Sequence, residues 1–254
     1  MEGIFYGKRA LVVGGTGGIG RAVALGLAGR GAAVTITGGS SRDRLNSALA
    51  ELDALGSGPG KAKNTGFLCN IGAPEGVLQE KAVPFILEQA GSPLDILVLA
   101  WGPFKKGSLQ ETKSENWRLL VENNLIFPGI MISSVLDGMI NRGWGRILLF
   151  GGTKTAEIRG FSDTAAYSAA KTALWVLAKS AAKSAGKAGV SCNVICPGLT
   201  DTEYTDPEIL AWYRKNSPEG KVLTTEEVAH CALGVLENPA INGTIIPVDS
   251  GLWI

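Results

Sequence analysis

Histidine is almost absent from this sequence, and neither sign of charge predominates. The one histidine among 254 residues, His230, lies in the helical stretch 224–236, where we expect it to pack rather than to catalyse. The 24 lysines and arginines nearly balance the 23 aspartates and glutamates, which gives a net charge of +1. No overall field therefore attracts nucleic acid or anionic lipid, and no basic cluster is interleaved with aromatic residues. We expect no nucleic-acid partner.

Cysteines are few and scattered. There are four, and only Cys192 and Cys196 are close together; alternation places both on one face of an apolar strand. A metal site or a disulfide would be the functional interpretation of such a pair. The scattered positions of all four instead favour buried, reduced thiols in a cytoplasmic protein, and no metal site.

Long apolar runs are missing as well. The first residues, MEGIFYGKRALVVGG, contain no long apolar region ahead of a cleavage site, so we expect no signal peptide. No stretch approaches the roughly 18 uninterrupted apolar residues of a membrane-spanning helix, so we expect no membrane span. The 45% of hydrophobic residues is ordinary for a soluble protein with a large core, and we expect a cytoplasmic location.

Apolar strand-like runs alternate with helical segments along the whole chain. The runs begin near residues 10, 33, 67, 95, 146, 190 and 244, and the helical segments cover about 19–30, 44–56, 76–89, 115–141, 164–184, 206–216 and a stretch from 225. This alternation predicts an α/β fold, a doubly wound parallel sheet with helices on both faces. Because no repeat, low-complexity tract or linker interrupts the pattern, residues 1–254 are expected to form a single domain.

A glycine-rich turn follows the first strand. Gly14, Gly18 and Gly20 form a GxxxGxG pattern between that strand and the first helix. Glycines at such a turn let backbone N–H groups approach a pyrophosphate at the helix N-terminus. A merely flexible strand-to-helix turn would share the pattern. Its place in the first strand–helix unit favours a dinucleotide site.

The end of the second strand bears on the choice of cofactor. An acidic residue there would bind both ribose hydroxyls and repel a 2′-phosphate. The chain carries glycines followed by hydroxyl and guanidinium groups, in Gly38, Gly39, Ser40, Ser41, Arg42 and Arg44. These groups suit a 2′-phosphate and favour NADP over NAD. The two arginines would equally serve as solvated residues in the first turn of the next helix.

A tyrosine and a lysine lie four residues apart, at Tyr167 and Lys171, and therefore on one face of a helix. A phenol with a pKa near 10 needs a shift of about three units to act as an acid or base near neutrality. A lysine charge at about 4 Å provides a free energy of that size. The pair is physically sufficient for proton transfer to or from a carbonyl oxygen.

These pieces occur in the order of a known family. The chain resembles the short-chain dehydrogenase/reductase family over essentially its whole length, through GxxxGIG from Gly14, the pair Asn124 and Leu125, YSAAK from Tyr167, CPGLTDT from Cys196 and NGTIIPVDSG from Asn242. The resemblance implies a Rossmann-type doubly wound sheet of about seven strands. It also implies hydride transfer between a nicotinamide and a carbonyl or alcohol substrate.

The resemblance assigns roles to individual residues. Tyr167 would be the general acid, Lys171 would hold the nicotinamide ribose and lower the tyrosine pKa, and Asn124 would anchor a water in the proton relay. The cofactor contacts that it implies, with the ribose-end residues above, are Gly14, Thr16, Gly18, Ile19, Gly20, Ser40, Arg42, Asn70, Ile71, Ala100, Gly102, Tyr167, Lys171, Pro197, Gly198 and Thr202.

Two departures from the family pattern fall on the site itself. The family's catalytic serine falls on Gly152, and its usual Asn-Asn-Ala-Gly appears as LAWG at 99–102. Thr153 is the nearest replacement hydroxyl, if the strand end bends by one residue, and Thr155 is a second candidate. Both threonines would otherwise only line a loop. Trp101 would either narrow access to the nicotinamide or pack in the core.

Two hypotheses follow. The first is an NADP-dependent carbonyl reductase in which Thr153 replaces the serine. The second is a non-catalytic sensor or scaffold that binds the dinucleotide, which Gly152 and the altered 99–101 segment favour. The stretch 200–221, with Leu210, Trp212 and Tyr213, predicts a lid over a partly apolar substrate. A 3-oxoacyl thioester is the default within the family; polyketide-type, sugar and steroid ketones are the alternatives.

Two helical stretches, 123–140 and 164–187, carry more small and apolar residues than one core face requires. Trp175 on the second is a natural contact anchor, and the apolar end Leu252–Ile254 suggests burial against another subunit. Family resemblance implies a homotetramer built through these helices and the last strand.

Overall fold

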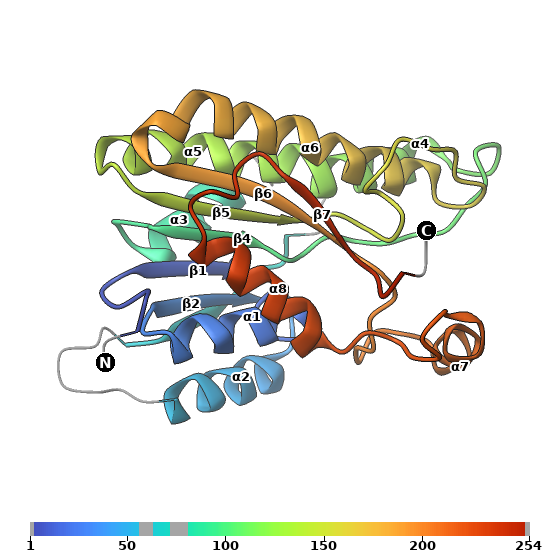
Figure 1. Ribbon diagram of the computed structural model, residues 1–254, viewed down its shortest axis with the longest axis horizontal. Coiled ribbons are helices and arrows are strands. Elements are labelled where there is room, and N and C mark those ends of the chain that lie inside the picture. Colours follow the sequence, from blue (N-terminus) through green and yellow to red (C-terminus); the bar gives the residue numbers. More distant parts are fainter. Residues whose placement is uncertain (1–2, 56–62, 72–80, 252–254) are drawn as a thin grey trace.

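A single parallel sheet organises the computed structural model, which describes residues 3–55, 63–71 and 81–251 (Figure 1). Its seven strands follow the order β3-β2-β1-β4-β5-β6-β7, and every neighbouring pair is parallel. The strands are β1 (Arg9–Val13), β2 (Ala33–Gly38), β3 (Thr65–Leu68), β4 (Ile96–Leu99), β5 (Gly145–Phe150), β6 (Val190–Pro197) and β7 (Ile245–Val248). The expected doubly wound α/β fold is confirmed.

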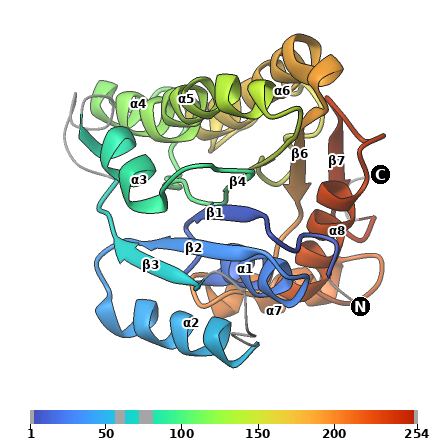
Figure 2. The ribbon, with the colours of Figure 1, turned by 90° about the vertical axis from the view of Figure 1, so that its left-hand side faces the viewer.

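Helices cover both faces of the sheet (Figures 1 and 2). On one face lie α1 (Gly18–Gly29), α2 (Arg42–Ala54) and α8 (Thr225–Glu237); on the other lie α3 (Val83–Ala90), α4 (Ser114–Val121), α5 (Phe127–Asn141) and α6 (Ala165–Ala185). The short helix α7 (Pro207–Asn216) stands apart at one end of the sheet (Figure 1). Because both faces are covered, the central strands read as continuous apolar runs, and β4 and β5 are buried at every residue.

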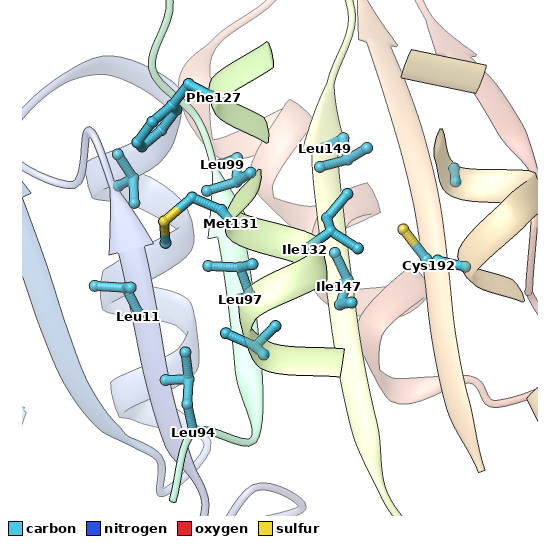
Figure 3. Close-up of a cluster of buried hydrophobic side chains, with 14 of the residues drawn as sticks. Leu11, Leu94, Leu97, Leu99, Phe127, Met131, Ile132, Ile147, Leu149 and Cys192 are labelled. Atoms are coloured by element: carbon cyan, nitrogen blue, oxygen red, sulfur yellow. The ribbon is translucent and has the colours of Figure 1, made fainter. Parts of the chain in front are cut away.

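The core between the sheet and α5 shows how the strands and helix interlock. Leu97 and Ile147 project from β4 and β5 toward Met131 and Ile132 of α5 (Figure 3). These side chains are at most 5% exposed. Burying a leucine, isoleucine or methionine side chain contributes about 1.5–3 kcal/mol, so this layer fixes the sheet on which the loops at its carboxyl edge stand.

The long helical stretch 114–141 is interrupted by a π-helical turn, η2 (Glu122–Ile126), between α4 and α5. As one continuous helix, Ser114–Asn141 is long and apolar enough to span a membrane, with a mean hydropathy of 1.5 over its most apolar window. Only 44% of that window is buried. Core helices of soluble proteins pass the same test, so the expected absence of a membrane span stays a prediction.

The structure also bears on what the sequence predicted for the histidine, the cysteines and two short segments. His230 is exposed on α8, so its expected packing role is wrong. Cys192 and Cys196 are buried on the same side of the sheet as expected, and the four cysteines are free thiols. Residues 76–80 of the expected helix 76–89 and the apolar end 252–254 lie outside the described residues; the rest of that helix is confirmed, with α3 beginning at Val83.

The strand order reverses between β1 and β4, which are neighbours although their connections run to opposite sides of the sheet. In such sheets the crevice outside the carboxyl ends of the strands at this point is the usual ligand site. The glycine-rich turn after β1 and the LAWG segment after β4 both open onto this crevice.

Candidate functional site

The glycine-rich turn after β1 depends on the small size of its residues. Gly14 has φ of +83°, in the left-handed region, and a Cβ there would lie 2.9 Å from the Trp101 Cβ. A Cβ on Gly20 would lie 2.2 Å from the Gly14 carbonyl oxygen and 3.1 Å from the Ala100 Cβ. The expected residues Gly14, Gly20 and Ala100 therefore meet at the strand-order reversal, where no larger side chains fit.

The N-terminus of α1 already binds an anionic group. Gly17 caps the helix without a side chain, and the backbone N–H of Gly18 donates to the Glu203 carboxylate at 3.2 Å. A Cβ on Gly17 would lie 2.1 Å from Glu203 Oε1, so the glycine leaves the space that the carboxylate fills. Unpaired N–H groups at a helix start favour anions, and the carboxylate stands in for one. This arrangement fits a cofactor pyrophosphate.

Beside Glu203, Tyr204 joins the glycine turn to α2. Its hydroxyl oxygen accepts from Arg44 Nη1 at 2.8 Å, and the guanidinium lies 4.9 Å from the tyrosine ring centroid. A groove of about 580 Å³ along this part of the molecule is lined by Thr16, Gly18, Arg44 and Thr202 among others. Four residues that the sequence linked to a cofactor thus share one groove.

The other residues expected at the adenosine end lie at the carboxyl edge of β2 and β3. Ser40 and Arg42 are exposed, and the neighbouring Ser41 caps α2 by accepting from the Arg44 N–H at 3.3 Å. Asn70 is exposed and Ile71 is buried after β3. The guanidinium connected to the glycine turn is that of Arg44 rather than Arg42, because Arg44 donates to Tyr204, which lies beside this turn.

Lys171, Asn124 and Gly102 converge on one spot. A Cβ on Gly102 would lie 2.1 Å from Asn124 Oδ1 and 3.3 Å from Lys171 Nζ. Asn124 sits in the π-helical turn η2, fully buried, and its Nδ2 donates to the Pro103 and Leu120 carbonyls at 3.0 Å. Its Oδ1 has no hydrogen-bond partner among the described residues, although such buried acceptors are normally paired. π-Helical turns are frequent at functional sites.

The Lys171 ammonium donates to the Phe150 carbonyl at 2.9 Å, at the end of β5. The side chain is buried, and burial lowers the pKa of Lys171 to about 8. Its Nζ lies 5.8 Å from the centroid of the Tyr167 ring. The lysine therefore contacts both the end of β5 and the tyrosine, and its ammonium loses its proton at a pH of about 8.

Tyr167 lies against backbone on one side and an aromatic edge on the other. A Cβ on Gly152 would lie 2.8 Å from its Cε1 and 3.0 Å from its Oη, and the Phe104 ring meets it edge-to-face with centroids 5.0 Å apart. Burial, with a smaller contribution from Cys196, raises the pKa of Tyr167, although part of the ring stays accessible. The expected lowering of this pKa by Lys171 is not found, because Lys171 is itself desolvated and donates to Phe150.

The two threonines after β5 differ. Thr155 is fully buried; its hydroxyl accepts from the Gly152 N–H and donates to the Gly152 carbonyl, both at 2.8 Å. Thr153 is partly exposed, and its side chain makes no hydrogen bond to any residue of the described ranges. Thr155 is therefore occupied with the backbone, while Thr153 stays the candidate for the replacement hydroxyl.

The segment after β6 approaches the same crevice. The Gly198 N–H donates to the Val248 carbonyl at 2.8 Å, which fixes Pro197 and Gly198 beside β7. Thr202 lies over the glycine turn, its Cγ2 3.5 Å from the Cβ position of Gly18. Trp101, by contrast, packs in the core with its ring edge-to-face on Phe127, at 6.2 Å. Its packing role, one of the two expected for it, is the one observed.

Three residues at the site, Glu203, Tyr204 and Phe104, were not predicted from the sequence, because they carry no motif of their own. Thr155 was predicted only as a hydroxyl donor to the substrate, and its bonds to the Gly152 backbone were not. The position of Glu203 and Tyr204 directly after the CPGLTDT motif was the one available signal.

The sequence of this chain is similar to those of known proteins. Residues 14–253 match a family model described as enoyl-(acyl carrier protein) reductase. The chain is 31% identical to the 3-oxoacyl-[acyl-carrier-protein] reductase FabG of Escherichia coli, over 98% of this chain and 99% of that protein. It is 30% identical to a 2-dehydro-3-deoxy-D-gluconate 5-dehydrogenase of Formosa agariphila, over 97% and 92%.

Solved structures agree. A short-chain dehydrogenase from Burkholderia cenocepacia in complex with NADP superposes with a TM-score of 0.82 at 30% identity, over 98% of both chains. A short-chain dehydrogenase/reductase from Serratia marcescens superposes with a TM-score of 0.85 at 28% identity, over 98% of this chain and 99% of the other. The glycine turn, the Tyr167–Lys171 pair and these matches lead to one conclusion: the chain belongs to the short-chain dehydrogenase/reductase family of oxidoreductases.

Proposed function

We propose that this oxidoreductase transfers hydride between NADP and a carbonyl or alcohol substrate. The observation that carries the proposal is the convergence of Tyr167, Lys171 and Asn124 beside the glycine turn, at the reversal of strand order. The glycine-rich turn, which suits a dinucleotide, and the Tyr167 hydroxyl, which suits proton donation to a carbonyl oxygen, thus lie at the same crevice.

In carbonyl reduction, the protein's own residues bind and orient the substrate and deliver a proton to it. A bound nicotinamide cofactor supplies the hydride to the carbonyl carbon. The Tyr167 hydroxyl donates its proton to the carbonyl oxygen, and its raised pKa keeps the phenol protonated until then. The Lys171 ammonium faces the resulting phenolate, whose charge it stabilises. The product is an alcohol, with one hydride and one proton added.

The preference for NADP rests on two supports. Arg44 places a guanidinium beside the glycine turn, and the segment 39–42 that leads from β2 into α2 carries the hydroxyls of Ser40 and Ser41 and no acidic side chain. The Burkholderia cenocepacia relative was solved in complex with NADP.

For the substrate, we propose a ketone with a partly apolar body, such as a 3-oxoacyl thioester. The exposed Phe104 ring beside Tyr167 offers an apolar wall, and the exposed Lys105 and Lys106 that follow it suit an anionic tail. The FabG name of the first relative supports the thioester. The name of the Formosa agariphila relative, a dehydrogenase of a deoxy-gluconate, supports an anionic keto-sugar instead. The assay therefore includes a thioester and a keto-sugar acid.

We also propose that the chain acts as a cytoplasmic homo-oligomer, a homotetramer by family resemblance. Reduced cysteines support the location. An open, apolar groove of about 580 Å³ between α5 and α6, lined by Leu125, Ile130 and Leu177 among others, supports assembly through these helices. The side-chain N–H of the neighbouring Trp175 is buried without a partner in the described chain.

The deciding experiment follows NADPH oxidation with a 3-oxoacyl thioester, a keto-sugar acid, a quinone and a steroid ketone. Turnover that disappears in Tyr167→Phe is the expected result, with Tyr6→Phe, at an exposed tyrosine outside the site, as the control for tyrosine loss. Tight NADPH binding without turnover on any carbonyl would overturn the proposal in favour of a non-catalytic dinucleotide-binding protein.

A further inference from the structure

The turn after β5 is held by one side chain. The Thr155 hydroxyl bonds both the N–H and the carbonyl of Gly152, and the Thr155 N–H donates to the same carbonyl at 3.1 Å. The Cys196 Sγ lies 3.5 Å from the same hydroxyl. Because Thr155 is fully buried, no water replaces these contacts when the hydroxyl is removed.

The backbone of this turn needs such support. Lys154, between Gly152 and Thr155, has φ of +64°, which is the left-handed region that residues with a Cβ rarely adopt. Strained positions persist where surrounding contacts over-determine them, and here the contacts come from Thr155. Removing its hydroxyl therefore releases the turn as well as two hydrogen bonds.

The same turn contacts both members of the catalytic pair. The carbonyl of Phe150, where the turn begins, accepts the Lys171 ammonium at 2.9 Å. The backbone of Gly152 forms the wall against which the Tyr167 ring lies. A shift of the turn consequently changes the position of the phenol and the environment of the lysine together.

We propose that Thr155 is a positioning residue: acting through the Gly152 backbone, its hydroxyl sets the place of the Tyr167 phenol. Gly152 has no side chain with which to bond the phenol, so the turn itself has to define the wall. The inference rests on the proposed function, since the position of the phenol has consequences only for proton transfer. It gives Thr155 a different task from donating to the substrate carbonyl.

The test compares Thr155→Val, which keeps the shape but loses the hydroxyl, with Thr155→Ser, which keeps the hydroxyl. Thr35→Val is the matched control, because Thr35 is also buried and hydrogen-bonded through its hydroxyl, to Thr65 at 2.9 Å in the sheet. We expect kcat to fall about ten- to a hundredfold in Thr155→Val, with NADPH affinity unchanged. Thr155→Ser should restore most of kcat, and Thr35→Val should lose stability but keep kcat.

A second readout needs no substrate. The sequence has four tyrosines, so ring-labelled tyrosine resolves Tyr167 by NMR, assigned with Tyr167→Phe. The Tyr167 resonance should move in Thr155→Val and stay in Thr155→Ser and Thr35→Val. If Thr155→Val does not fold, Thr155→Cys, whose thiol is a weak hydrogen-bonding group, should shift kcat and the resonance in the same direction.

The outcomes separate the two claims. An unchanged Tyr167 resonance in Thr155→Val, or a Thr155→Ser variant as impaired as Thr155→Val, overturns the positioning role. Absence of turnover in the unmodified protein on every carbonyl overturns the proposed function, and the resonance then still decides whether Thr155 positions the phenol.

Discussion

The backbone of Gly152 lies directly against the phenol of Tyr167: a Cβ on the glycine would be 3.0 Å from the phenolic oxygen and 2.8 Å from the ring. The ring thus fills part of the space that a side chain at position 152 would need. The position lacks a hydroxyl, and it also lacks room for one unless the tyrosine moves.

This contact predicts the effect of enlarging Gly152. Gly152→Ala should displace the Tyr167 ring and lower kcat about ten- to a hundredfold, because small misplacements of a catalytic group are costly. Gly152→Ser, which adds the family's hydroxyl, should do no better than Gly152→Ala. Steady-state kinetics of the two variants separate the steric effect from the hydroxyl. A Gly152→Ser enzyme clearly faster than Gly152→Ala would contradict the prediction.

The pKa of Lys171 predicts a pH dependence of activity. Since burial lowers this pKa to about 8, the ammonium loses its proton as the pH rises through that value. The rate of carbonyl reduction should therefore decline above a pH of about 8. A profile of kcat against pH checks this, with Lys171→Met as the variant in which any remaining activity should lack that decline.

The same shift predicts a pH dependence of stability. In the unfolded chain Lys171 has its ordinary pKa of 10.5, so between about 8 and 10.5 the unfolded state binds more protons than the folded one. Burying the lysine charge therefore destabilises the fold below pH 8, and this penalty is lost as the pH rises. Urea unfolding should show Lys171→Met gaining stability relative to the unmodified protein at pH 7, and less of a gain at pH 9.5. A gain that grows with pH would refute this.

The Glu203 carboxylate on the Gly18 N–H should compete with a cofactor phosphate. Glu203→Gln should strengthen NADPH binding about two- to fivefold, the worth of a carboxylate at a helix N-terminus. Fluorescence titration of the cofactor measures this change. Glu208→Gln, on the exposed surface of α7, is the matched control and should leave the affinity unchanged. Weaker binding in Glu203→Gln would instead make Glu203 a cofactor ligand.

Arg44 should decide between the two cofactors. Arg44→Ala should reduce the ratio of NADPH to NADH affinity about tenfold, because a guanidinium contact to a phosphate is charge-assisted. Arg42→Ala, which removes an exposed guanidinium in the same helix turn, provides the comparison. If Arg42→Ala lowers the ratio and Arg44→Ala does not, the 2′-phosphate lies on the outer side of α2.

The groove between α5 and α6 predicts an effect on assembly. Ile130→Asp places a charge among its apolar residues and should shift sedimentation toward the monomer at micromolar concentration. Leu55→Asp, which changes an exposed leucine at the end of α2, should not. A monomer in the unmodified protein would remove the basis for a homotetramer.

The sequence predicts the strands and the placement of Tyr167 and Lys171 on one helix well, because both depend on local spacing. Runs such as Ile96–Leu99 read as buried strands, and a spacing of four places Tyr167 and Lys171 on one face of α6. The assignment of the family's serine position to Gly152 agrees with the glycine's place beside the phenol.

Contacts between distant parts of the chain were not predictable in this way. Nothing near Phe104 indicates that its ring meets Tyr167, and nothing near Glu203 indicates that it reaches α1. Charge and hydrophobicity patterns also do not show where backbone groups need a hydrogen-bond partner. The sequence therefore indicated Thr155 only as a second candidate for the replacement hydroxyl. The exposure of His230 shows the converse, since a helical stretch rich in apolar residues still has an outer face.

The hydrogen bond from Gly18 to Glu203 joins residues 185 positions apart. On the ribosome the glycine turn is made early, while its carboxylate partner and the strands β6 and β7 follow late. The central strand β1 likewise has both edges paired only after β4 has been synthesised. Folding that depends on such distant pairings is slow, and an incomplete chain has an open, unpaired edge. The contact between Glu203 and the glycine turn therefore forms late in the synthesis of each molecule, and it distinguishes a finished chain from a truncated one.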